Sequence, residues 1–100
     1  MEVKVCRLQD IPDDGILGAE VEGQRIILVR RGDRVYALEG TCTHEEFDLA
    51  QGVLVEDRII CTLHLSSFQL ETGEVLSPPA ERPLRTYRVI LRGEEVYVEV

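Results

Sequence analysis

The sequence has few cysteines, histidines and basic residues, and it has no long apolar run. Its 100 residues include three cysteines, two histidines and eleven basic against nineteen acidic side chains, for a net charge of −8. An acidic surface repels phosphate backbones and anionic lipids, so we expect neither nucleic acid nor a membrane as a partner. No apolar run approaches the ~20 residues of a membrane helix, which argues against a membrane span.

The first residues also lack the features of a signal peptide. MEVKVCRL alternates charged and apolar side chains, without a basic start or a long apolar stretch. We therefore expect a cytoplasmic protein. With 44% hydrophobic and 30% charged residues, the composition is typical of a globular chain. The length suits one domain over residues 1–100, which we expect to be a monomer.

Helical periodicity is nearly absent; only residues 45–50 have apolar side chains at helical spacing. Short apolar runs and turn residues alternate instead along the whole chain. The predicted strands cover residues 1–8, 19–21, 24–29, 35–38, 53–55, 58–60, 68–70, 75–76, 84–91 and 95–100. Eight or more short strands with frequent turns predict an all-β fold, an antiparallel sandwich or small barrel.

Two short stretches contain both histidines and two of the three cysteines. They are Cys42-Thr43-His44 and, after sixteen intervening residues, Cys61-Thr62-Leu63-His64. Each stretch offers one thiolate and one imidazole, which are typical ligands of soft and borderline metals. The pattern predicts a metal site made of Cys42, His44, Cys61 and His64, on loops whose backbone amides can turn toward sulfur.

C-x-H followed by C-x-x-H at this separation resembles the Rieske-type 2Fe-2S proteins. The likeness continues in CTHEEFDLAQG and CTLHLSSFQLETGEVLSPP, and it covers roughly the last sixty residues. The matching positions beyond the ligands are Leu49, Gly52, Phe68, Thr72, Gly73, Pro78 and Pro79. Two positions depart from the family pattern, because Thr62 replaces a common proline and Leu65 replaces the usual glycine.

The resemblance implies a β-fold with a cluster-binding subdomain of two hairpin loops. In this family two cysteines hold one iron and two histidines hold the other. The oxidised cluster with its thiolates is then neutral, so it accepts an electron more readily than a four-cysteine cluster does. The expected potential lies in the range of about −150 to +300 mV, against about −400 mV for plant-type ferredoxins.

Within the family, the chain looks like the ferredoxins that feed bacterial aromatic-ring oxygenases. High-potential members have a disulfide between the loops, and its positions here hold Phe47 and Leu63. Ser66 stands where high-potential members place a hydroxyl near a bridging sulfide, whereas Phe68 stands where they have a tyrosine. The resemblance implies a one-electron carrier between a flavin-dependent, nicotinamide-oxidising reductase and a terminal oxygenase in aromatic hydrocarbon catabolism.

Two alternatives belong to other classes. A zinc ion could join the loops through the same four ligands, although zinc knuckles usually pair Cys-x-x-Cys with His-x-x-x-His. An enzyme is disfavoured, because both histidines serve as ligands and no glycine-rich phosphate loop is present. We therefore predict no catalytic residue.

Three further expectations concern residues around the ligands. The 77–83 segment, SPPAERP, is too proline-rich for a strand, so we expect it to fold over the second ligand loop. The hydroxyl of Ser66 either donates to a cluster sulfur or only shapes the loop. Cys6 is expected to be an ordinary strand residue, which leaves no disulfide pair and favours reducing conditions.

The loop ends are also expected to form the docking surface. The resemblance places the outer nitrogens of His44 and His64 at the surface, with Leu65 and Pro78 as an apolar collar. Glu45 and its neighbour Glu46 would steer the protein toward a basic patch on its partner.

Overall fold

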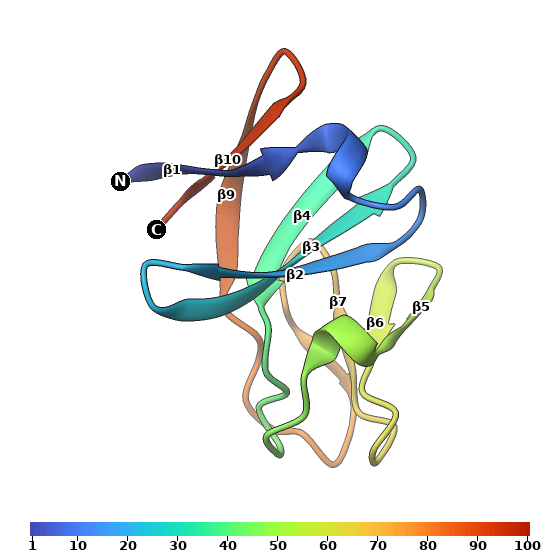
Figure 1. Ribbon diagram of the computed structural model, residues 1–100. Helices are drawn as coiled ribbons and strands as arrows, with labels where there is room; N and C mark the ends of the chain where they lie inside the picture. Colours follow the sequence, from blue (N-terminus) through green and yellow to red (C-terminus); the bar gives the residue numbers. More distant parts are fainter.

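The computed structural model describes all 100 residues as ten strands and two single-turn 3-10 helices (Figure 1). The strands are β1 (Glu2–Arg7), β2 (Ile16–Val21), β3 (Gln24–Arg31), β4 (Arg34–Glu39), β5 (Val53–Val55), β6 (Arg58–Ile60), β7 (Ser67–Gln69), β8 (Val75–Ser77), β9 (Thr86–Arg92) and β10 (Glu95–Glu99). The helices are η1 (Leu8–Asp10) and η2 (Leu49–Gln51). None of the helices is long or apolar enough to cross a membrane. The predicted all-β class is confirmed.

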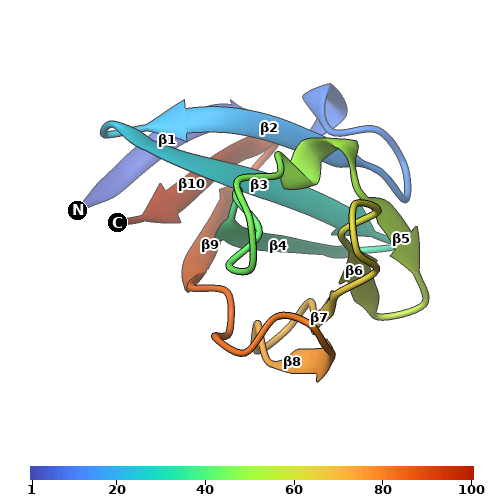
Figure 2. The same cartoon turned by 90° about the horizontal axis from the view of Figure 1, so that it is seen from below.

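Six strands form one antiparallel sheet in the order β1-β10-β9-β4-β3-β2. The sheet curls so that its edge strands β1 and β2 approach each other, which nearly closes a small barrel (Figures 1 and 2). Two-residue turns at Gly32-Asp33 and Gly93-Glu94 join β3 to β4 and β9 to β10. Gly32 and Gly93 have positive φ, as these tight turns require.

The four short strands form a second antiparallel sheet in the order β5-β6-β7-β8. Its fully buried side chains include Ile59 and Phe68. Three loops extend beyond it and reach the same end of the molecule, drawn in green, yellow and orange at the bottom of Figure 1. They contain the two predicted ligand stretches and the proline-rich segment, so the small sheet carries the candidate site.

Strand β3 connects the two halves because both of its faces are buried. Ile26 and Leu28 belong to the core of the six-stranded sheet, together with Val96 and Val98. Ile27 and Val29, on the opposite face of the same strand, belong to a core that includes both ligand cysteines and Phe68. Alternate side chains of one strand therefore anchor the loop-bearing end on the barrel.

Most strand boundaries differ from the predicted ones by one or two residues, and three segments show the physical reason or a larger difference. Strand β2 begins at Ile16, three residues early, because Ile16 pairs with Val29 of β3. Strand β9 begins at Thr86, because the N–H of Leu84 donates to the carbonyl of Gly73 (2.9 Å) and draws the chain toward the small sheet. Residues 45–50, whose apolar side chains have helical spacing, do not form a helix of that length. Only the last two of these residues, 49 and 50, belong to η2.

Candidate metal centre

The first ligand loop is closed by its own backbone. The N–H of Cys42 donates to the carbonyl of Phe47 (2.9 Å), and the N–H of Leu49 donates to the carbonyl of Gly40 (2.8 Å). Asp48 accepts from the N–H of Ala50 (3.0 Å), which caps η2. The loop thus returns to its starting point and holds Cys42 against the core.

Arg25 of β3 ties this loop to the large sheet. Its guanidinium pairs with the carboxylate of Asp48 at 2.9 Å, and its carbonyl accepts from the N–H of Gly40, also at 2.9 Å. The pKa of Asp48 is lowered: partial burial raises it, but hydrogen bonds from the Ala50 N–H and from Arg25 outweigh that effect. Asp48 therefore stays ionised and keeps the loop anchored at neutral pH.

The second ligand loop turns sharply after its histidine. The N–H of Cys61 donates to the carbonyl of Ser66, and the N–H of Leu65 donates to the carbonyl of Cys61, both at 2.8 Å. Leu65 has φ of +65°, a left-handed conformation that costs a non-glycine residue about 1–2 kcal/mol. Leucine thus adopts the conformation for which this turn ordinarily uses glycine.

The proline-rich segment covers both loops, as expected for the second. The N–H of Ala80 donates to the hydroxyl oxygen of Ser66 (3.0 Å), which is completely buried. The hydroxyl of Thr43 donates to the carbonyl of Arg82 (2.5 Å). These bonds join three loops into one unit. The hydroxyl of Ser66 donates to no protein acceptor.

The two cysteines of the loops lie in the core, with only 4% of Cys42 and 2% of Cys61 exposed. Burial raises the pKa of the Cys61 thiol, and the nearby Cys42 thiol raises it further. Hydrogen bonds from the N–H groups of Leu63 and His64 lower this pKa, but the net shift is upward. A bound metal would supply the positive charge that keeps both thiolates deprotonated.

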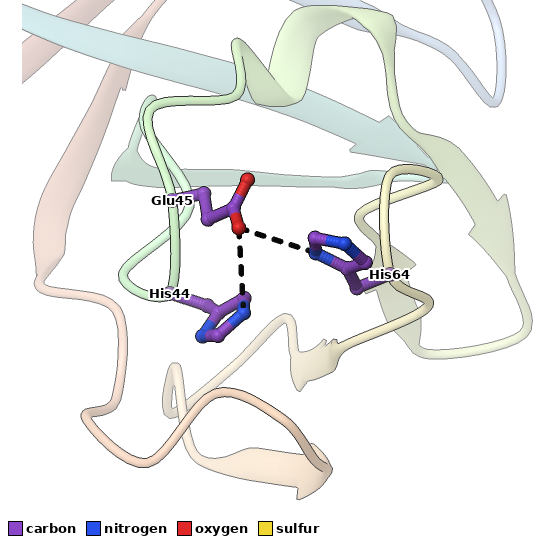
Figure 3. Close-up of side chains that lie close together, drawn as sticks. All are labelled: His44, Glu45 and His64. Atoms are coloured by element: carbon purple, nitrogen blue, oxygen red, sulfur yellow. Dashed lines mark ion pairs between the residues drawn. The ribbon is translucent and has the colours of Figure 1, made fainter.

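The two histidines face each other at the surface, one from each loop (Figure 3). Their ring centroids are 5.4 Å apart and their planes are inclined by 75°. One third of the His44 side chain and about half of the His64 side chain are exposed (33% and 48%). The structure thus places a pair of accessible imidazoles outside a pair of buried thiols.

The position of Glu45 was not anticipated from the sequence. We expected its carboxylate to face an approaching partner, but Oε1 lies 3.8 Å from Nε2 of His44 and 3.5 Å from Nδ1 of His64 (Figure 3). Its position next to His44 was the only signal available. The contact with His64 depends on how the two loops meet, which no local pattern encodes.

The four predicted ligands differ in how deeply they lie. The thiols of Cys42 and Cys61 are buried, whereas the imidazoles of His44 and His64 face each other at the surface. Glu45 has a ligand atom within 4.8 Å of those of both histidines. A buried thiol pair and an exposed imidazole pair are compatible with a 2Fe-2S cluster that has cysteines on one iron and histidines on the other.

Comparison with known proteins agrees with this geometry. The family model described as "Rieske [2Fe-2S] domain" matches residues 1–88, and the chain belongs to this family. The cofactor of the family is a Rieske-type 2Fe-2S cluster. The biphenyl 2,3-dioxygenase ferredoxin component of Rhodococcus jostii (strain RHA1) is 34% identical over 97 residues, covering 97% of this chain and 91% of that protein.

Solved structures of similar ferredoxins have the same fold. The ferredoxin of carbazole 1,9a-dioxygenase from Nocardioides aromaticivorans IC177 superposes with a TM-score of 0.93 at 33% identity, covering 98% of this chain and 96% of that one. A chain in a complex of reduced oxygenase and oxidized ferredoxin of carbazole 1,9a-dioxygenase gives a TM-score of 0.90 at 36% identity, covering 97% of this chain and 91% of that one. The predicted family and fold are confirmed.

Proposed function

We propose that this chain is a one-electron carrier that acts as a single domain and a monomer. Cys42 and Cys61 hold one iron of its cluster, and His44 and His64 hold the other. The observation that carries the proposal is the separation of the ligands into a buried thiol pair and an exposed imidazole pair. When bound, the cluster supplies a centre that accepts and releases one electron at moderate potential.

The protein contributes insulation on one side and access on the other. The core around the cysteines excludes water from the sulfur side. Around the histidines, Leu63 and Leu65 are 49% and 66% exposed, and apolar side chains on both sides of His64 suit contact with another protein. Electrons therefore enter and leave through the imidazole side, where a partner approaches most closely.

The partners we propose are a flavin-dependent, nicotinamide-oxidising reductase as donor and a terminal oxygenase of the aromatic-ring type as acceptor. The support comes from relatives named as ferredoxin components of biphenyl and carbazole dioxygenases, and from the complex of such a ferredoxin with its oxygenase. All three cysteines are free thiols. Free thiols suit a reducing compartment, so we place the protein in the cytoplasm.

Metal analysis and redox titration test the proposal together. A red-brown protein with about two irons and two acid-labile sulfides, reduced by one electron per cluster, is the expected result. A colourless protein with one zinc would overturn it in favour of the zinc-joined module. The physiological role is tested separately, by oxygenase turnover that requires both a reductase and this protein.

A further inference from the structure

Beside the first ligand loop the surface has a hollow of about 270 Å³ that differs in charge from the rest of the molecule. Three arginines line it, namely Arg25, Arg82 and Arg85, whereas Glu39 is its only acidic lining residue. The lining carries three positive charges and one negative charge. Asp48, outside the lining, pairs with Arg25, so one positive charge remains unpaired in a chain whose net charge is −8.

Much of the hydrogen-bonding capacity of these arginines is unused. Arg25 pairs with Asp48 at 2.9 Å and Arg82 pairs with Glu39 at 3.2 Å, each through one nitrogen. The guanidinium of Arg85 forms no ion pair and no hydrogen bond. Only its backbone is engaged: its N–H donates to the carboxylate of Glu39 (3.0 Å), and its carbonyl accepts from the N–H of Glu39 (2.8 Å). A guanidinium has several N–H donors in a planar fork that matches a carboxylate.

The hollow is continuous with the surface around the histidines. Arg82 lines both this hollow and a second one, which also contains His44 and Thr43. Thr41, which precedes the ligand Cys42, lines the basic hollow. A protein seated over His44 therefore comes within reach of the three arginines.

We propose that this basic hollow binds an aspartate or glutamate side chain of the redox partner that docks over His44. The inference rests on the proposed function, because it requires a partner at the imidazole side. Charge complementarity selects an acidic group, and the volume suits one side chain and not a folded segment. The carboxylate would lie between the free guanidinium of Arg85 and the unused donors of Arg25 and Arg82, which fixes the rotation of the partner about the histidines.

The test is a titration of the oxidised holoprotein with a short acidic peptide, acetyl-Asp-Glu-Asp-Glu-amide, at constant ionic strength. The Nε–H signals of the arginines are followed by NMR. We expect saturable shifts at the three arginines of the hollow, and none with the matched Asn-Gln-Asn-Gln peptide. No saturation, or equal shifts with the neutral peptide, would overturn the proposal.

Two variants with the same change in charge separate the hollow from general electrostatics. Arg85→Gln removes the free guanidinium and keeps the backbone bond to Glu39. We expect it to weaken binding of the acidic peptide by roughly fivefold, as for a solvent-exposed charge pair. Arg88→Gln, on the exposed part of β9 outside the hollow, should leave the affinity unchanged. Equal weakening by both variants would contradict a specific site.

Inorganic phosphate distinguishes a partner side chain from a free oxyanion. If phosphate saturates the hollow at lower concentration than the peptide does, the hollow is an oxyanion site and the proposal fails. Because the readout is binding to the oxidised protein, failure here leaves the electron-carrier proposal intact. Conversely, a protein without the two-iron cluster would refute the proposed function whatever the peptide does.

Discussion

The six-stranded sheet and the loop-bearing end differ in how their backbone is held. Strands of the large sheet contain five to eight residues and are joined in part by two-residue turns. Each strand of the small sheet contains three. The loops beyond it depend on single hydrogen bonds, such as Ala80 to Ser66, and on a strained Leu65. The barrel is stabilised by its own pairing and burial, whereas we expect the ligand end to depend on its metal.

Removal of a ligand should produce the largest difference between the two regions. We expect Cys61→Ser to abolish the visible absorption of the cluster and to expose amides of both ligand loops to hydrogen exchange. Amides of β3 should remain protected, because their pairing with β2 and β4 does not involve the metal.

Cys6→Ser is the matched control for this change. Cys6 lies half-buried in β1, packs against the core of the large sheet, and pairs with Val96 of β10. Its spectrum should be that of the unaltered protein. A normal cluster in the Cys61 variant would refute the ligand assignment, and global loss of protection would show that the barrel is not independent.

Two glycines with similar backbone conformations test the tightness of each region. Gly73, near the small sheet, has φ of +77°, and a Cβ there would lie 2.1 Å from the carbonyl oxygen of Leu84. Gly93, in the turn between β9 and β10, has φ of +63° and nothing within 4 Å. Gly73→Ala should lower the free energy of unfolding by about 2–5 kcal/mol, since left-handed strain and displacement of the backbone add up.

Gly93→Ala should cost only the conformational penalty of about 1–2 kcal/mol. Denaturant unfolding of both variants measures the two losses. Equal losses would mean that the segment carrying Leu84 moves away at little cost, and that the ligand end is looser than its contacts indicate.

Ser66 connects the stability of the ligand end with its redox chemistry. Its oxygen accepts from the N–H of Ala80 inside the protein, so Ser66→Ala leaves that amide unpaired, at a cost of about 1–3 kcal/mol. If its free hydroxyl hydrogen also faces a cluster sulfur, the reduction potential should fall by on the order of 40 mV, the equivalent of ~1 kcal/mol for one electron.

Ser67→Ala is the control for Ser66→Ala. Ser67 is the adjacent buried serine, and its hydroxyl bonds to that of Ser77 (2.6 Å). We expect its replacement to leave the potential unchanged. A potential that is also unchanged in Ser66→Ala would assign that serine a purely structural role.

The large sheet was predictable from local patterns, because alternation of apolar residues and turn glycines act within a few residues of each other. The turns at Gly32 and Gly93 lie where the sequence places them. The start of β2 at Ile16 was missed, since only pairing with β3 makes that segment a strand.

At the ligand end, the sequence names candidate ligand residues but does not predict their orientation. Cysteine and histidine spacing identifies the two loops without any knowledge of the fold. The contact of Glu45 with His64, and the positive charge gathered by Arg25, Arg82 and Arg85, depend on segments far apart in the chain. No propensity within a single loop encodes such contacts.

The strain at Leu65 offers a modest stabilisation of the ligand end. Leu65→Gly removes a left-handed penalty of about 1–2 kcal/mol, partly offset by the greater flexibility of glycine in the unfolded chain, about 0.5–1 kcal/mol. We expect the temperature at which half of the visible absorption is lost to rise by a few degrees, because a stabilisation of ~1 kcal/mol raises the unfolding temperature of a domain of this size by several degrees. Leu65→Ala keeps the backbone penalty, so it should not show this rise; a similar rise in both variants would exclude backbone strain as the cause.

The smallest expected effect concerns two ion pairs, one in each region. Arg25 holds Asp48 at 2.9 Å beside the first ligand loop, and Lys4 holds Glu95 at 2.6 Å on the large sheet. The lowered pKa of Asp48 means that its stabilisation is present above the ordinary carboxyl pKa of 3.8 and is lost as pH falls through the folded-state value. In Arg25→Gln the pKa of Asp48 should rise toward 3.8, so the loop should release its cluster at a higher pH.

The expected shift in release pH is small. An exposed ion pair is worth at most ~1 kcal/mol and one pKa unit corresponds to ~1.4 kcal/mol, so the shift should be less than about one pH unit. Absorbance after a fixed incubation at each pH measures it. Lys4→Gln removes the same charge from the large sheet and should leave the release pH unchanged; an equal shift would mean that net charge, and not the anchor on the loop, controls acid release.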